Sequence, residues 1–68
     1  MRADLKIIEQ WVKPESSVLD VGCGDGTLLY HLQENKQVSG YGLEINSANI
    51  TSCIDKGVNV LEQNLLLT

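Results

Sequence analysis

Three glycines and an aspartate that could hold a small ligand occur within seven consecutive residues. Gly22, Gly24 and Gly26 alternate with other residues, and Asp20 precedes them by two positions. Glycine removes the side chain where a backbone turns sharply and where a ligand approaches it closely. A helix beginning near Thr27 would point its N-terminal N–H groups at the same crevice. This spacing predicts a ligand-binding loop between a strand and a helix.

A second chemically suggestive residue, Glu44, follows the loop by about twenty residues, the spacing of the acid that binds ribose hydroxyls in nucleotide-binding α/β folds. A carboxylate accepts hydrogen bonds from both the 2′ and 3′ hydroxyls, which selects an unphosphorylated ribose. Ile45 would then offer an apolar surface to the adenine. The simpler alternative is a tight turn followed by a solvated glutamate at a strand end.

The details of the loop favour one class of nucleotide over another. The dinucleotide pattern Gly-x-Gly-x-x-Gly asks for glycine at position 27, where this chain has Thr27. Asp20 lies within an apolar strand, where a carboxylate is unfavourable unless it is bonded. An acid there can face the ammonium group of a methionine moiety, directly or through water. A nicotinamide or flavin dinucleotide site is therefore the weaker interpretation.

The elements that must position these residues follow from the hydrophobic pattern. Apolar residues at helical spacing predict a first helix, which Pro14 ends. Short apolar runs predict buried parallel strands, and Asn46 or Ser47 can begin the last helix, with Gly57 after its end. The expected order is helix (about 2–12), strand (17–21), helix (27–34), strand (38–43), helix (from 46 or 47 to about 56) and strand (58–61).

This order predicts the α/β class: a truncated Rossmann-like half with a three-stranded parallel sheet in the order 3-2-1. Parallel crossovers are right-handed in ~98% of cases, so both crossover helices should cover the same face of the sheet. The other face and one edge of the first strand would lie bare. We therefore expect residues 1–68 to be a partial domain that needs either more chain or a partner, including self-association through the exposed sheet.

Composition narrows the setting and the partners. The chain has 68 residues with a net charge of −4, and its five basic residues are scattered. An acidic surface without a basic patch argues against nucleic acid and against an anionic membrane as partners. No segment approaches the ~20 apolar residues of a membrane span, and no secretory leader is visible, so we expect a cytoplasmic protein. Two cysteines without metal-ligand spacing predict free thiols and no metal site.

The sequence resembles a known family over nearly all of its length. Its strand-Asp-x-Gly-x-Gly-x-Gly pattern is similar to the first motif of class I S-adenosylmethionine-dependent methyltransferases. The segments Gly40-Tyr41-Gly42-Leu43-Glu44-Ile45 and Gly57-Val58-Asn59-Val60 narrow the resemblance to the N-terminal part of the methionine-biosynthesis family MetW.

The resemblance implies S-adenosylmethionine as the cofactor and a place near the homoserine acyl-transfer step of methionine synthesis, with homoserine O-acetyltransferase as a possible partner. It also implies that an acid just after the third strand lies near the adenine amino group, where this chain has Asn64. The implied cofactor-binding residues are Asp20, Gly22, Cys23, Gly24, Gly26, Glu44, Ile45 and Asn64.

Other chemically capable residues have structural explanations. We expect His31 to be a surface residue, since no nucleophile or metal partner is identifiable. We expect Trp11 to pack the first helix onto the sheet, and Asp25 to cap the following helix. We assign no catalytic residue, because the resemblance implies that the loop after a fourth strand supplies the acceptor contacts, and residues 1–68 predict three strands. A non-catalytic interaction module therefore remains the alternative to a cofactor-binding domain.

Overall fold

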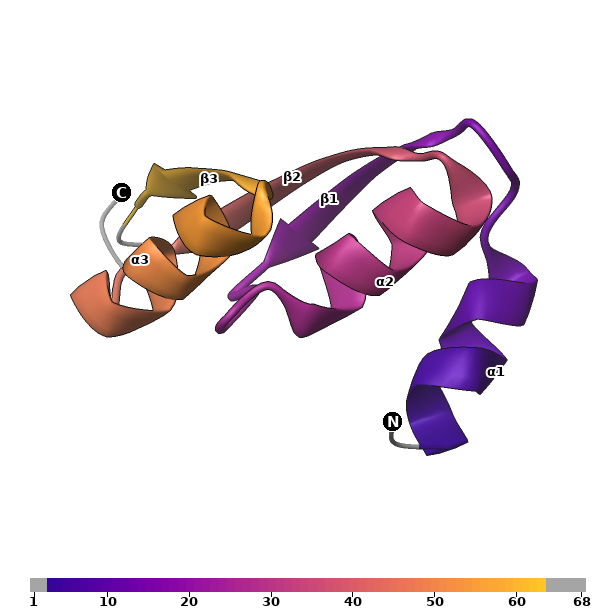
Figure 1. Ribbon diagram of the computed structural model, residues 1–68, viewed down its shortest axis with the longest axis horizontal. Helices are drawn as coiled ribbons and strands as arrows, with labels where there is room; N and C mark the ends of the chain where they lie inside the picture. Colours follow the sequence, from indigo (N-terminus) through magenta and orange to yellow (C-terminus); the bar gives the residue numbers. More distant parts are fainter. Residues whose placement is uncertain (1–2, 64–68) are drawn as a thin grey trace.

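The computed structural model describes residues 3–63, and these form an α/β structure in which helices and strands alternate (Figure 1). The predicted fold class and element order are confirmed, with every boundary within two residues of the expected one. The elements are α1 (Ala3–Trp11), β1 (Ser17–Val21), α2 (Thr27–Lys36), β2 (Ser39–Glu44), α3 (Ser47–Lys56) and β3 (Asn59–Glu62).

The three strands form one parallel sheet in the order β1-β2-β3, the same sheet as the predicted order 3-2-1. The register places Leu19 beside Tyr41 and Val21 beside Leu43. Because the strands are parallel, their carboxyl ends meet at one edge of the sheet. This edge brings the glycine loop after β1 next to the end of β2.

The third helix begins and ends as its sequence predicts. Asn46 is the N-cap of α3, and its side chain accepts a hydrogen bond from the backbone N–H of Asn49 at 3.0 Å. Gly57 adopts a left-handed conformation after the helix, and its N–H bonds the carbonyl oxygens of Cys53 and Ile54. This pairing satisfies backbone groups that a helix end otherwise leaves without partners.

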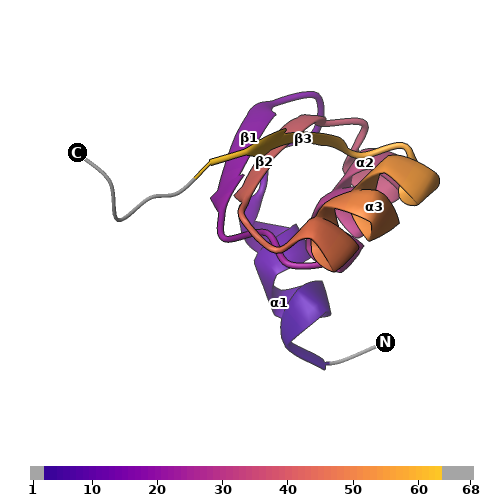
Figure 2. The same ribbon diagram turned by 90° about the vertical axis from the view of Figure 1, so that its left-hand side faces the viewer.

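Both crossover helices lie on one face of the sheet, as the handedness of parallel crossovers predicts (Figure 2). We call this the covered face and the opposite one the open face. Residues alternate between the two faces along each strand. The open face carries four large side chains that are more than half exposed: Leu19, Val21, Tyr41 and Leu61.

The core lies between the covered face and the two helices. It is built from Leu29, Cys23, Cys53 and Val58, with Val18 and Val60 packed against them. Two glycines in β2 allow this close approach. A Cβ atom at Gly40 would lie 3.0 Å from a Leu29 methyl group, and one at Gly42 would lie 2.4 Å from the sulfur of Cys23.

Two packing predictions are wrong. Trp11 is 77% exposed and does not pack α1 onto the sheet. Helix α1 instead contacts α2 through a face that buries Leu5, which leaves Trp11 on the outer side. Helical spacing predicts that Ile50, Cys53 and Ile54 form the buried face of α3. Ile54 is instead 64% exposed, because α3 lies along the edge formed by β3 and presents Cys53 to the core.

The prediction that the opposite face of the sheet lies bare is confirmed within residues 3–63, where Leu19 and Tyr41 are more than half exposed.

No helix among residues 3–63 is long and apolar enough to cross a membrane.

Candidate functional site

The glycine loop adopts a backbone that only glycine enters readily. Gly22, Gly24 and Gly26 have φ angles of 71°, 60° and 85°, in the left-handed region that a Cβ atom disfavours. A Cβ atom at Gly22 or Gly24 would meet nothing within 4 Å, whereas one at Gly26 would lie 2.9 Å from the sulfur of Cys53. The first two glycines therefore leave open space in front of the loop, and the third allows the loop to pack against α3.

Most of the loop N–H groups already have partners inside the protein. The N–H groups of Gly22 and Cys23 both donate to the carbonyl oxygen of Leu43, at 2.8 and 3.1 Å. The N–H of Gly24 donates to Glu44 at 2.8 Å, and that of Gly26 donates to the carbonyl of Cys23 at 3.2 Å. The loop therefore offers a ligand its shape and its open space more than free donors.

Glu44 is placed at the loop by the end of β2. Its Oε1 accepts the N–H of Gly24 at 2.8 Å, and its Oε2 accepts the N–H of Asn46 at 3.1 Å and the side-chain amide of Asn49 at 3.5 Å. The hydrogen bonds from Asn46 and Gly24 lower the pKa of this carboxyl below its ordinary value. Glu44 is therefore an ionised acceptor that joins β2, the glycine loop and the start of α3.

Asp20 lies in β1 on the covered face, two residues after Val18. Its side chain is partly buried, and burial raises the pKa of its carboxyl above the ordinary value. No residue in the described part of the chain donates a hydrogen bond to this carboxylate. A partly desolvated carboxylate without a partner favours a cationic ligand, which would supply the missing interaction.

The remaining predicted site residues fall into three situations. Ile45 is 54% exposed just after Glu44, so its side chain is available to an apolar group. Cys23 is buried in the core, and its side chain points away from solvent. Asn64 lies outside the described residues.

Asp25 accepts the first N–H of α2, as its position in the sequence predicts, while Gly26 occupies the N-cap position. Its Oδ1 accepts the backbone N–H of Thr27 at 3.0 Å and the Thr27 hydroxyl at 2.6 Å. The bonds from Thr27 lower the pKa of the Asp25 carboxyl. The Asp25 carbonyl also accepts a hydrogen bond from the Lys56 ammonium at 3.1 Å, which ties the loop to the end of α3.

His31 is not the surface residue that the sequence predicts. Its ring lies between α1 and α2 with a side chain that is 14% exposed, and Nε2 contacts the Glu9 carboxylate. The Asn35 amide lies 3.2 Å from Nδ1. Because both ring nitrogens have neighbours within hydrogen-bond reach, the geometry describes a link between two helices rather than a free general base.

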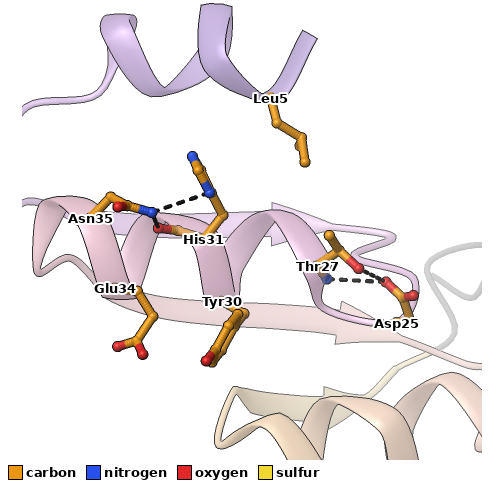
Figure 3. A pocket seen from close by; sticks show the side chains of 7 residues that line it. All are labelled: Leu5, Asp25, Thr27, Tyr30, His31, Glu34 and Asn35. Atoms are coloured by element: carbon orange, nitrogen blue, oxygen red, sulfur yellow. Dashed lines mark hydrogen bonds between the residues drawn. The ribbon is translucent and has the colours of Figure 1, made fainter. Parts of the chain in front are cut away.

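An open pocket of about 560 Å³ lies beside this histidine, between α1 and α2 (Figure 3). Figure 3 shows Leu5 reaching toward the pocket from α1, while Tyr30 and Glu34 point away from α1. Of the glycine-loop residues 22–26, only Asp25 lines it. The pocket is therefore separate from the predicted cofactor-binding set at the end of β2.

The asparagines that support Glu44 were missed by sequence reasoning as site residues. The sequence pattern predicts Asn46 only as a helix cap and indicates no role for Asn49. A signal was available, because a cap two residues after the acid directs its own N–H back toward the strand end. Their hydrogen bonds to Glu44 hold its carboxylate over the loop.

Solved structures with the same fold are methyltransferases, at identities low enough to show the fold alone. A TehB-like SAM-dependent methyltransferase from Corynebacterium glutamicum matches with a TM-score of 0.82 and 16% identity over 96% of this chain and 36% of that chain. The M. capricolum TrmK, in complex with S-adenosyl-homocysteine, matches with a TM-score of 0.74 and 16% identity over 98% of this chain and 34% of that one.

A SAM-dependent methyltransferase from Geobacter sulfurreducens, in complex with S-adenosyl-L-homocysteine, has a TM-score of 0.70 and 18% identity over 93% of this chain and 29% of that one. The chain thus spans about a third of the length of these structures. A search of curated proteins finds no match.

The sequence itself matches a family model over almost its whole length. The model described as Methionine biosynthesis protein MetW covers residues 2–67. The matched residues include the glycine loop and the segment ending in Glu44, which the structure brings together at one edge of the sheet. This chain belongs to the MetW family.

Proposed function

We propose that this chain binds S-adenosylmethionine at the carboxyl edge of its sheet, with Glu44 as the ribose acceptor and Asp20 facing the ammonium of the methionine part. The observation that carries the proposal is the position of Glu44, whose carboxylate is held over the glycine loop by the N–H of Gly24. Two methyltransferases of the same fold are complexes with S-adenosylhomocysteine, which supports this choice of ligand.

The carboxylate of Glu44 has room for a ribose. An ionised carboxylate offers about four acceptor positions, and three donors from the protein reach this one. One ribose hydroxyl takes the remaining position. The second replaces the Asn49 amide, whose contact at 3.5 Å is the longest of the three.

Asp20 would attract the ammonium of the ligand through its charge, whereas Glu44 would orient the ribose through hydrogen bonds. An ammonium near a partly buried carboxylate stabilises the ionised form and offsets the desolvation that raises its pKa. The space in front of Gly22 and Gly24 admits the methionine part between the two acids. The residues of this chain would thus bind and orient the cofactor, and the cofactor would supply the methyl group for transfer.

Calorimetric titration with S-adenosylhomocysteine tests the proposal. We expect saturable binding that weakens about tenfold or more in Glu44→Gln, because hydrogen bonds to charged groups are the strong ones. The matched control is Glu34→Gln, which removes the same charge from an exposed residue in the pocket between α1 and α2. Equal losses in both variants, or no binding by a chain that is folded by circular dichroism, would overturn the proposal.

The family also suggests the wider role. We propose that the protein acts in the cytoplasm at the homoserine acyl-transfer step of methionine biosynthesis, alongside homoserine O-acetyltransferase. The family description supports the pathway. Co-purification of the two proteins from cell extract, with Glu44→Gln as a variant, tests the pairing; absence of the acyltransferase from the purified complex would contradict it.

A non-catalytic interaction module is the second candidate, and the open face favours it. Leu19, Val21, Tyr41 and Leu61 form exposed apolar surface on three adjacent strands, and exposed apolar patches mark interaction sites. Sedimentation of the chain over a range of concentrations tests self-association through this face. A chain that remains monomeric at every concentration would contradict it.

A further inference from the structure

The two cysteines of the chain meet in the core, although 30 residues separate them. The sulfur of Cys23, in the glycine loop, lies 3.8 Å from the sulfur of Cys53, in α3. Both are free thiols, with exposed fractions of 8% and 0%. Each also lies near the carbonyl oxygen of Gly24, at 3.7 and 3.4 Å, so one backbone group holds the two sulfurs side by side.

Glycines enclose the space that the sulfurs occupy. A Cβ atom at Gly42 would lie 2.4 Å from the sulfur of Cys23, and one at Gly26 would lie 2.9 Å from the sulfur of Cys53. A disulfide needs a separation of about 2.05 Å, so the sulfurs must approach further. Cys23 lies between two positive-φ glycines, Gly22 and Gly24, and glycine is the residue that best tolerates the backbone change that a closer approach requires.

We propose that Cys23 and Cys53 form a reversible intrachain disulfide when the chain meets a peroxide, and that this bond ties the glycine loop to α3. The Cys23 sulfur attacks one peroxide oxygen, so an S–O bond forms and the O–O bond breaks. The departing hydroxide takes the thiol proton and leaves as water. The Cys53 sulfur then attacks the Cys23 sulfur, the S–O bond breaks, and hydroxide leaves with the second thiol proton as water. The two sulfurs are oxidised and the peroxide is reduced.

The surroundings of the pair set how readily it reacts. Burial raises the pKa of the Cys23 thiol to about 12, and the Cys53 thiol and the charges of Asp20 and Glu44 act in the same direction. Because the thiolate is the reacting form, oxidation is slow at neutral pH and accelerates as the pH rises.

Peroxide treatment of the chain under native conditions tests the crosslink. We expect both thiols to disappear together, the mass to fall by the two hydrogens lost, and a single peptide joining Cys23 to Cys53 to appear after digestion. Circular dichroism should keep its helical signal, and the unfolding midpoint in denaturant should rise, since a crosslink restricts the unfolded chain. Cys23→Ala and Cys53→Ala are the controls, each of which should retain one thiol that forms no intrachain bond.

Three results would overturn the proposal: persistent free thiols, interchain dimers as the main product, or an oxidised chain that loses its helical signal or its unfolding transition. Each would mean that the folded chain does not bring the two sulfurs into bonding distance.

The consequence for ligand binding rests on the proposed function, because Cys23 belongs to the proposed cofactor loop. We expect the oxidised chain to bind S-adenosylhomocysteine at least about fivefold more weakly, the lower end of ordinary coupling between two sites, with recovery after reduction. Unchanged affinity in a crosslinked chain would contradict this regulatory role. Absence of binding in the reduced chain would instead contradict the proposed function, and it would leave the thiol and mass measurements unaffected.

Discussion

On the covered face of the sheet, side chains meet two helices and form the core, while on the open face side chains of the same kinds meet solvent. Leu29 of α2 packs against the covered face and is fully buried, whereas Leu19 of β1 on the open face is 62% exposed. The predicted site follows the same division, since Asp20 and the Cys23 side chain lie on the covered side. The comparison teaches that residues 3–63 pack one face of the sheet, and that the proposed binding site lies on the side that they pack.

The largest expected effect is the difference between two leucine-to-alanine substitutions, one in the core on the covered face and one on the open face. Leu29→Ala should lower the free energy of unfolding by about 2–5 kcal/mol, because it leaves a cavity in the core. Leu19→Ala should change it by no more than about 0.5 kcal/mol, as surface substitutions do. Denaturant unfolding followed by circular dichroism measures both. A loss in Leu19→Ala as large as that in Leu29→Ala would show that the open face is covered in solution.

The glycines of β2, which let the core pack closely against the covered face, give a second test. Gly42→Ala should lower the free energy of unfolding by about 1–3 kcal/mol through overpacking, since its Cβ would lie 2.4 Å from the Cys23 sulfur. Ser39→Ala is the control, because Ser39 is exposed on the same strand. Chemical denaturation of the two variants should separate them, and equal midpoints would contradict the close approach of the loop to β2.

The two acids of the site should have opposite effects on stability. The pKa of Asp20 is raised by burial, so the folded chain holds its proton to higher pH than the unfolded chain, and the free energy of unfolding falls as the pH rises through that window. Asp20→Asn should therefore stabilise the fold at pH 7. The pKa of Glu44 is lowered, so its contribution is present above the ordinary glutamate pKa and is lost as the pH falls. Glu44→Gln should destabilise the fold at pH 7.

Unfolding curves of both variants from pH 3 to pH 8 measure these signs. If both substitutions shift the free energy of unfolding in the same direction at pH 7, the opposite pKa shifts assigned to the two carboxyls are wrong. Binding adds a further check, since Asp20→Asn should weaken the binding of S-adenosylhomocysteine even though it stabilises the fold.

The smallest effect is expected at Trp11. Trp11→Ala should change the free energy of unfolding by no more than about 0.5 kcal/mol, because the ring is 77% exposed. In the unmodified chain, the fluorescence emission of Trp11 should have its maximum at the wavelength of a solvent-exposed tryptophan. A blue-shifted spectrum would contradict this placement of α1.

Local sequence signals were sufficient to predict the strands, the helices and the meeting of the glycine loop with Glu44. Short apolar runs, Pro14, Asn46 and Gly57 act within a few residues, so their effects can be predicted without a structure. The handedness of crossovers then determines which face the helices cover.

Contacts between distant segments could not be predicted in this way. The contact between Cys23 and Cys53 depends on how α3 packs against the glycine loop. The hydrogen bonds from the loop N–H groups to the carbonyl oxygen of Leu43 depend on the register of the strands. The exposure of Trp11 depends on which face of α1 meets α2. Helical periodicity shows that a helix is amphipathic and does not show what it packs against.

The most direct test of the cofactor site is amide NMR of the chain titrated with S-adenosylhomocysteine. The account predicts shifts at Gly22, Gly24 and Ile45, beside the proposed ligand, and smaller ones at Leu19 and Tyr41 on the open face. Shifts confined to Tyr30, His31 and Asn35 would place the ligand in the pocket between α1 and α2. That result, or an unchanged spectrum, would contradict a cofactor site at the carboxyl edge of the sheet.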